Sequence, residues 1–375
     1  MAVTIGVIKE RAHGESRVAM VPDVAKKLAG AGMGLVIERD AGLVAGFADA
    51  AYGTVEVEDG AEAVYARADI VFAVQPPDPS LAARLKPGAV LLGALAPYRE
   101  PALVKALRDA GTTSFALELL PRTTRAQAMD ILSSQAAAAG YKAMLIAAQA
   151  APKFFPMLTT AAGTVRPSKV LVIGAGVAGL QAIATARRLG AMVEGFDVRP
   201  ETREQIESLG AKVLDLGVSA KGEGGYAREL NAEERAQQQA ALASHLKGID
   251  VVVTTAAVPG RPAPKIVSAA MVAGMKPGAV IVDLAAETGG NCELTRAGET
   301  VDHGGVRILG PVNLPAQTAT HASEMFARNL FTFAQLLVAD GALTLDFADD
   351  LVAGSCLTHG GEIRHAGTRE AIGHG

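Results

Sequence analysis

A glycine-rich turn between two apolar segments contains the residue types and spacing that most directly indicate chemistry. Residues 170–180 read as a buried strand, then Gly174-x-Gly176-x-x-Gly179, then the start of a helix. The first glycine allows a tight bend, the second lets a pyrophosphate approach the main chain, and the third lets helix and strand pack closely. The helix N-terminus adds amide donors and a favourable dipole for phosphates. The pattern predicts a dinucleotide site formed by Gly174, Ala175, Gly176, Val177, Ala178 and Gly179.

An acidic residue ends the next apolar segment. Asp197 closes the run Ala191-Met-Val-Glu-Gly-Phe-Asp. A carboxylate at this place accepts hydrogen bonds from a ribose 2′-hydroxyl and repels a 2′-phosphate. The strand, the turn, the helix and the acid together are more specific than three glycines alone. Asp197 therefore predicts that this chain binds NAD(H) rather than NADP(H).

A second polar cluster lies in the segment Pro121–Gln135. Arg122, Gln127 and Asp130 occur in a loop that leads into a long helix. Arginine offers paired donors, glutamine offers a donor and an acceptor, and aspartate can hold the arginine in place. The alternative is an ordinary helix entry with a surface ion pair, and spacing alone favours neither.

Four other segments are candidates with open alternatives. The Gly-rich stretch before the polar helix 231–245 holds Tyr226, which suits a mobile flap or a loose surface loop. Residues 254–260 and 287–291 follow two strand ends and would lie at the rim of the dinucleotide site. Arg17, in a charged opening loop, would hold a carboxylate or pair with Glu10 or Glu15.

Short strand-like segments alternate with helical ones along the whole chain, which predicts parallel sheets covered by helices. Asp69-Ile-Val-Phe followed by Lys86-Pro-Gly-Ala-Val resembles Asp250-Val-Val-Val followed by Lys276-Pro-Gly-Ala-Val. This internal repeat predicts an α/β protein of two tandem doubly wound, Rossmann-like domains. We expect residues 1–135 with 322–375 to form one domain, without the glycine pattern, and 136–321 to form the NAD(H) domain. Two long helices, Arg125–Ala151 and Ser323–Ala339, are expected to join them, with a ligand cleft between the domains.

Composition excludes several classes of protein. A net charge of −4 gives no basic footprint for nucleic acid. Cys292 and Cys356 are far apart and read as free thiols, and the seven histidines show no metal spacing, so no metal site is expected. The most apolar helical stretches are too short or too interrupted to cross a membrane, so no direct membrane insertion is expected.

The chain resembles the soluble NAD(H)-binding component of proton-translocating nicotinamide nucleotide transhydrogenases. The resemblance covers nearly the full length. Its most specific residues are Arg122-x4-Gln127-x2-Asp130-Ile-Leu-Ser133-Ser-Gln, the segment Gly174–Ala186, Asp197-Val-Arg199 and Gly224-Gly-Tyr226-Ala.

The resemblance implies an enzyme in which hydride passes directly between NADH on this chain and NADP⁺ on a partner component, while a membrane component couples the transfer to proton movement. It implies that Arg122, Gln127 and Asp130 act at the nicotinamide end, with Ser133 nearby. Asp197, Val198 and Arg199 would meet the adenosine side, and Tyr226 would lie on a loop that closes over the cofactor. Gly225, Gln238 and Ala257 would add contacts. The expected partners are NADP(H)-binding and membrane-spanning subunits and a second copy of this chain, in the cytoplasm at the inner face of the membrane.

Two alternatives remain open at this point. Alanine dehydrogenases share the Lys-Glu-x6-Arg-Val-Ala opening, but resemblance places their substrate-handling Lys and His at Gln75 and Ala94 here. Neither side chain can serve as an acid or base, which argues against oxidation of an amino acid. The second alternative is a non-catalytic NAD(H) sensor.

Overall fold

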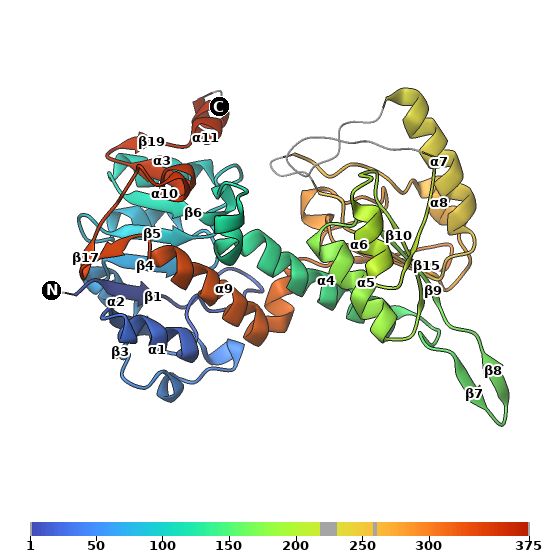
Figure 1. Cartoon of the computed structure of the whole chain (residues 1–375), viewed down its shortest axis with the longest axis horizontal. Coiled ribbons are helices and arrows are strands. Elements are labelled where there is room, and N and C mark those ends of the chain that lie inside the picture. The colour runs from blue at the N-terminus through green and yellow to red at the C-terminus, as the bar shows by residue number, and fades with distance from the viewer. Residues whose placement is uncertain (1, 218–230, 258–260, 374–375) are drawn as a thin grey trace. The chain divides into compact units, whose positions relative to one another are not determined.

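The computed structural model describes residues 2–217, 231–257 and 261–373 and divides into two compact units (Figure 1). One unit combines Met1–Gln135 with Pro315–Gly375, and the other is Ala136–Leu314. The sequence predicts that the chain returns to the first unit at residue 322, but that residue lies inside a helix and the division falls at Pro315.

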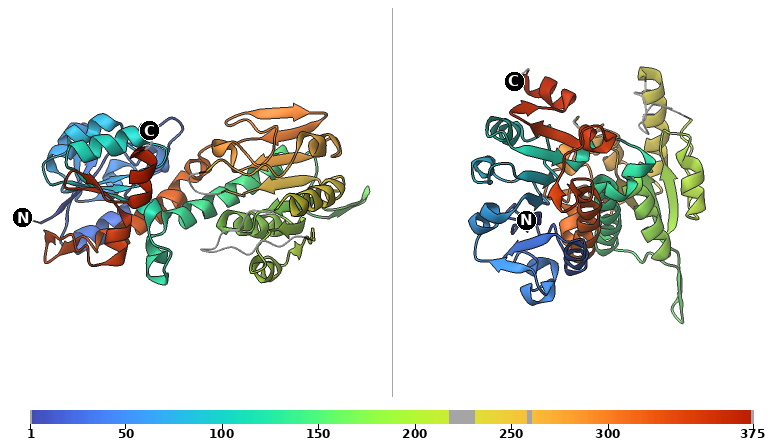
Figure 2. Two further views of the ribbon diagram at one scale, coloured as in Figure 1. Left: turned by 90° about the horizontal axis from the view of Figure 1, so that it is seen from above. Right: turned by 60° about the vertical axis from the view of Figure 1, so that its left-hand side comes forward.

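The first unit is built on an eight-stranded sheet with the order β19-β18-β6-β5-β4-β1-β2-β3. Six strands are parallel; β18 runs antiparallel to β6, and β19 runs antiparallel to β18. Helices cover both faces and bury an apolar cluster on each (Figure 2). The strands are β1 Thr4–Val7, β2 Gly34–Glu38, β3 Glu56–Glu58, β4 Ile70–Ala73, β5 Val90–Gly93, β6 Thr113–Ala116, β18 Cys356–His359 and β19 Glu362–Ile363; the helices are α1 Pro22–Gly30, α2 Ala61–Arg67, α3 Pro101–Asp109, α9 Ala319–Ala334, α10 Asp350–Ser355 and α11 Ala366–Gly373.

The second unit repeats this architecture with the order β11-β10-β9-β12-β13-β15-β14, in which only β14 is antiparallel. In both units the six parallel strands have the order 3-2-1-4-5-6, which is the doubly wound dinucleotide-binding arrangement. This confirms the predicted fold class. The strands are β9 Lys169–Ile173, β10 Met192–Phe196, β11 Lys212–Val213, β12 Val251–Thr254, β13 Val280–Asp283, β14 Thr300–His303 and β15 Val306–Leu309; the helices are α5 Val177–Arg188, α6 Thr202–Ser208, α7 Ala232–Leu246 and α8 Ala269–Ala273, and a separate hairpin joins β7 Leu158–Thr160 to β8 Gly163–Val165.

The two similar sequence segments, at residues 69–90 and 250–280, form equivalent ion pairs in the two units. In the first unit, Lys86 Nζ lies 2.7 Å from Asp69 Oδ1, and the other carboxylate oxygen accepts the N–H of Thr4 at the start of β1. In the second unit, Lys276 Nζ lies 2.7 Å from Asp250 Oδ1, and Asp250 Oδ2 accepts the N–H of Lys169 at the start of β9. Each aspartate thus satisfies the first main-chain donor of the central strand, which explains why the same residues recur.

Both predicted linking helices are shorter than expected. A 3-10 segment, Thr124–Met129, precedes α4 (Ile131–Ala150), so the helix does not begin at Arg125. It begins after Asp130 because that carboxylate accepts the N–H of Ser133 and so replaces a missing helical partner.

The second helix, α9, ends at Ala334 rather than at 339. Val338–Ala339 instead pairs with Ala342–Leu343 as the hairpin β16–β17. Asp340 and Gly341 both have positive φ, as the two-residue turn of such a hairpin requires. The Asp-Gly pair therefore overrides the apolar periodicity.

Candidate functional site

The glycine turn lies at the carboxyl end of β9, at the centre of the second sheet. Gly174 has φ +98°, a conformation that favours glycine. A Cβ on Gly179 would lie 1.8 Å from the Gly174 carbonyl oxygen, whereas a Cβ on Gly176 would meet nothing within 4 Å. The first and third glycines are therefore required by the fold, and the second opens onto free space beside the main chain.

The peptide between Gly174 and Ala175 is held from both sides. The hydroxyl of Thr255, just after β12, donates to the Gly174 carbonyl oxygen at 3.0 Å. The N–H of Ala175 donates to Asp197 Oδ2, just after β10, at 2.8 Å. The two neighbouring strands thus fix the orientation of the turn.

Asp197 is also paired with Arg199. The guanidinium donates from Nε at 2.9 Å and from Nη2 at 2.7 Å, and the main-chain N–H of Arg199 donates to Asp197 Oδ1. Burial opposes ionisation, but the hydrogen bonds from Arg199 and Ala175 outweigh it and hold the pKa of Asp197 below its ordinary value. The acid is charged at neutral pH, and an arginine lies beside it.

These features fit a dinucleotide. Gly176 leaves room for a group to approach the start of α5, whose first-turn N–H groups and dipole favour phosphate. The charged carboxylate of Asp197 at the end of the next strand suits a ribose diol. Val177, which begins the helix, has its side chain exposed, while Ala178 approaches α4 closely: a Cβ on Gly140 would lie 2.0 Å from the Ala178 carbonyl oxygen.

Asn291, the last residue of the rim segment 287–291, binds the chain just after β12 at this edge of the sheet. Its fully buried amide accepts the N–H of Ala256 at 3.0 Å and donates to the carbonyl oxygens of Ala256 at 2.8 Å and Pro264 at 2.9 Å. Ala257, a predicted contact, is exposed just beyond. The sequence indicated that residues 254–260 and 287–291 share a rim, but it gave no sign of these hydrogen bonds.

The polar cluster of residues 122–133 belongs to the first unit. Arg122 and Gln127 are exposed. Asp130 accepts hydrogen bonds from both the hydroxyl, at 2.6 Å, and the main-chain N–H of Ser133. It therefore orients the Ser133 side chain and also caps the N-terminus of α4.

Arg17 lies in a buried network within the first unit. Its guanidinium donates to both oxygens of Glu15, at 2.9 and 2.7 Å, and to Gln135 Oε1 at 2.8 Å. Gln75 donates to Glu15 Oε2 at 2.7 Å. Arg17 therefore pairs with Glu15, which was one of the partners that the sequence allowed for it.

Two neighbouring carboxyls of this network differ in pKa. Burial raises the pKa of Glu10 to about 7, although the N–H of Val74 donates to it. For Glu15, burial is outweighed by hydrogen bonds from Arg17 and Gln75, which lower its pKa to about 2. Glu10 is therefore the carboxyl of the pair that gains or loses a proton near neutrality.

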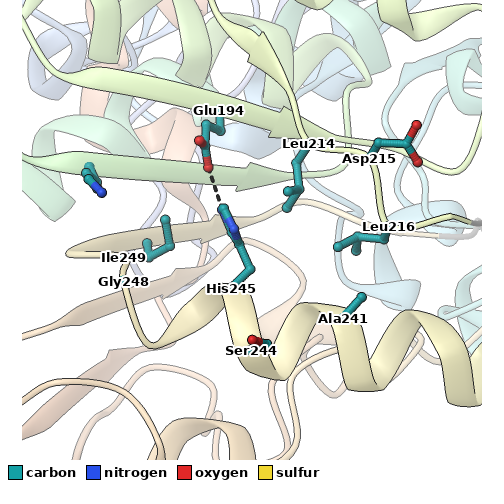
Figure 3. Close-up of a pocket in the computed structure, with 10 residues that line it drawn as sticks. Glu194, Leu214, Asp215, Leu216, Ala241, Ser244, His245, Gly248 and Ile249 are labelled. Carbon is teal, nitrogen blue, oxygen red and sulfur yellow. Dashed lines mark hydrogen bonds and ion pairs between the residues drawn. The ribbon is translucent and has the colours of Figure 1, made fainter.

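The predicted flap residues Gly225 and Tyr226 lie outside the described residues. Gln238 is buried on α7, whose start at Asn231 is fixed by reciprocal hydrogen bonds with Glu234. The far end of α7 lines a cavity of about 410 Å³, where His245 Nε2 lies 2.5 Å from Glu194 Oε2 on β10 (Figure 3). This cavity includes Lys169, at the opposite end of β9 from the glycine turn, so it is separate from the dinucleotide site.

Within the described ranges, no helix has the length and apolar character needed to span a bilayer. The same residues contain no group of three His, Cys, Asp or Glu side chains placed to hold a metal ion.

Comparisons with known proteins agree with this geometry. The N-terminal domain model of alanine dehydrogenase/PNT matches residues 6–139, and the C-terminal domain model matches residues 143–366. The chain is 44% identical to the first part of NAD(P) transhydrogenase subunit alpha from Rhodospirillum rubrum, over 96% of this chain and 97% of that protein.

Two solved structures share the whole architecture. A transhydrogenase from Sinorhizobium meliloti superposes with a TM-score of 0.85 at 42% identity, covering 97% of this chain and 99% of that one. An L-alanine dehydrogenase superposes with a TM-score of 0.83 at 26% identity, covering 99% of each. The chain thus belongs to the alanine dehydrogenase/PNT family and, within it, to the NAD(P) transhydrogenase alpha subunits.

Proposed function

We propose that this chain is the NAD(H)-binding component of a proton-translocating transhydrogenase. The observation that carries the proposal is the glycine turn pinned between Thr255 and a charged Asp197, with open space at Gly176. When bound, the nicotinamide would supply the hydride. The residues of the chain would orient the ring and exclude water, because direct transfer needs close alignment and no protein acid or base.

Roles for the predicted residues follow the family resemblance. Gly174–Gly179 bind the pyrophosphate, and Asp197, Val198 and Arg199 bind the adenosine side. Arg122, Gln127 and Asp130 act at the nicotinamide end, where Gln127 aligns the two rings and Ser133, oriented by Asp130, contacts the cofactor. Gly225, Tyr226, Gln238 and Ala257 complete the set of contacts.

The partners of this chain would be an NADP(H)-binding subunit and a membrane-spanning subunit that couples transfer to proton movement. The Rhodospirillum rubrum relative is named as one part of a subunit alpha, and that name supports the existence of further subunits. We place the chain in the cytoplasm, held at the inner face of the membrane by these subunits, as a homodimer.

The test of this function has two steps. Calorimetric titration with NADH and NADPH side by side should show binding of NADH and at least tenfold weaker binding of NADPH. Adding an NADP(H)-binding component and an NADP⁺ analogue should then give transfer from NADH. Equal affinity for the two coenzymes, or no transfer despite tight NADH binding, would contradict the proposal.

Gln127→Asn tests the ring-alignment role. The side chain is shortened by one methylene but keeps its amide, so transfer should slow about tenfold or more while the NADH dissociation constant changes little. A large loss of NADH affinity with unchanged transfer would reassign Gln127 to ground-state binding.

A further inference from the structure

The strongest unassigned feature of the second unit is a lateral chain of hydrogen bonds along the carboxyl edge of its sheet. It runs from Asn291, after β13, to Ala256, after β12, and from Thr255 to Gly174, after β9. Asp197, after β10, completes it at Ala175. Four neighbouring strands are thereby tied at the level where they end.

Asn291 closes the base of the loop that follows β12. Its side-chain nitrogen donates to Ala256 before the loop and to Pro264 after it, and its oxygen accepts from Ala256. The backbone carbonyl of Asn291 also accepts the N–H groups of Ile266 and Val267. An asparagine has two donors and one acceptor group in a planar amide, and here all three functions are used on main-chain atoms of one loop.

Thr255 connects that loop to the glycine turn by hydrogen bonds. Its hydroxyl proton is directed to the Gly174 carbonyl, whose oxygen is the atom that a Cβ on Gly179 would strike. The main-chain N–H of Thr255 donates to Ile173 at 2.9 Å, so main chain and side chain both bind the end of β9. A shift of residues 255–257 would therefore shift the glycine turn.

We propose that Asn291 and Thr255 are positioning residues, which hold residues 255–257 against the glycine turn and thereby set the place of the nicotinamide half of the cofactor. The inference rests on the proposed function. Neither side chain is assigned a cofactor contact, because the described hydrogen bonds of both go to main-chain atoms. Their effect is on ring placement, and the adenosine half is held separately at Asp197.

The experiment compares variants of the full chain that remove a hydrogen bond without changing shape. Thr255→Val removes the hydroxyl, Thr255→Ser restores it, and Asn291→Leu removes all three side-chain hydrogen bonds. Thr185→Val is the matched control, because it deletes a buried hydroxyl that donates to Gln181 within α5 and touches no part of this edge. Circular dichroism establishes that each variant is folded, and Asn291→Asp, which keeps the acceptor, replaces Asn291→Leu if the latter does not fold.

Two quantities are measured: the ratio of the dissociation constants for NADH and ADP-ribose, and the transfer rate at saturating NADH with the partner component. ADP-ribose lacks the nicotinamide, so its affinity reports the adenosine half. Thr255→Val and Asn291→Leu should shift the affinity ratio and lower the saturated rate about tenfold or more. Thr255→Ser and Thr185→Val should stay within about twofold of wild type on both measures.

The inference is overturned if Thr255→Ser behaves like Thr255→Val, or if the valine and leucine variants leave both measures at the wild-type level. It is also overturned if ADP-ribose and NADH lose affinity equally. A wild-type chain that transfers no hydride would instead defeat the proposed function, and the affinity ratio would still decide the role of the two residues.

Discussion

Asp197 has three roles that one carboxylate performs at once. It accepts the N–H of Ala175 in the glycine turn and it pairs with Arg199, and under the proposed function it also binds the ribose. The guanidinium of Arg199 is paired with Asp197, so we expect it to attract a 2′-phosphate less than an unpaired arginine would. We therefore propose that coenzyme choice depends on the Asp197–Arg199 pair rather than on the acid alone.

Asp197→Ala should weaken NADH binding by roughly 1–3 kcal/mol, because a ribose acceptor and the anchor of Ala175 are lost together. It should strengthen NADPH binding, because Arg199 is released toward a 2′-phosphate. Calorimetry with both coenzymes measures this. Asp215→Ala, which removes an exposed pair with Arg203 and a hydrogen bond from the N–H of Gly217, should leave both affinities unchanged. Unchanged NADH affinity in Asp197→Ala would remove Asp197 from the site.

Glu10 should make the first unit lose stability as pH rises. Its folded pKa of about 7 lies above the ordinary value of 4.5, so the unfolded chain releases the proton first and the folded state becomes relatively less favourable between those two values. Glu10→Gln removes this dependence. The unfolding free energy of the variant minus that of wild type should increase by about 2 kcal/mol from pH 5 to pH 8. Chemical denaturation at both pH values measures the gain, and the exposed Glu62→Gln should show none.

The packing of α4 against α5 depends on the absence of one side chain. Gly140 lies in the interior of α4, where glycine lowers helix stability, yet any Cβ there would overlap the Ala178 carbonyl of α5. Close approach of the two helices thus outweighs the intrinsic preference for alanine. Since Ala178 is in the first turn of α5, the same contact helps to place the end of the helix that we propose binds the phosphates.

Gly140→Ala should destabilise the chain by about 1–3 kcal/mol, because overlap with main-chain atoms exceeds the gain of about 1 kcal/mol in helix propensity. It should also weaken NADH binding by displacing the start of α5. Gly30→Ala is the matched control at the end of α1, where a Cβ would meet nothing within 4 Å, and it should be neutral or stabilising. Thermal unfolding and NADH titration test both variants; equal effects would show that the helix contact is not limiting.

The two units share one architecture, but only the second unit contains the Gly-x-Gly-x-x-Gly motif. The six parallel strands have the same order in both units, and the same Asp–Lys pair lies at the start of the central strand in each. In the first unit the carboxyl end of β1 leads instead into the charged loop that holds Glu10 and Arg17. Fold is therefore shared, and the site is set by the residues that follow the strands.

The β7–β8 hairpin is the surface on which we expect the second copy to dock. It extends away from the sheet of the second unit, and Phe154 and Met157 at its base are 58% and 63% exposed (Figure 1). Exposed apolar groups of this size are typical of interfaces. Phe154→Ser combined with Met157→Ser should convert the dimer to monomer in sedimentation experiments. Met192→Ser, at an exposed methionine on β10, should not. A wild-type monomer, or an unchanged dimer in the double variant, would contradict this interface.

Local patterns in the sequence were sufficient for the fold class and for the backbone geometry of the glycine turn. The strand–turn–helix pattern predicts the glycine turn because its steric requirements fall on neighbouring residues, and the repeated Asp and Lys-Pro-Gly segments predict two copies of one domain. Where two local signals competed, as at Asp340-Gly341 after α9, periodicity gave the wrong helix end because the turn residues determine the backbone there.

Only the tertiary structure decided which side chains hold the site together. Thr255 reaches Gly174 across 81 positions, and Asn291 reaches Ala256 across 35. Arg17 likewise takes Glu15 and the distant Gln135 as partners. Burial repeats with the period of a helix or strand and so leaves a trace in sequence, whereas a hydrogen bond from one side chain to a distant main-chain atom has no period. Such contacts exist only after the strands have been brought side by side.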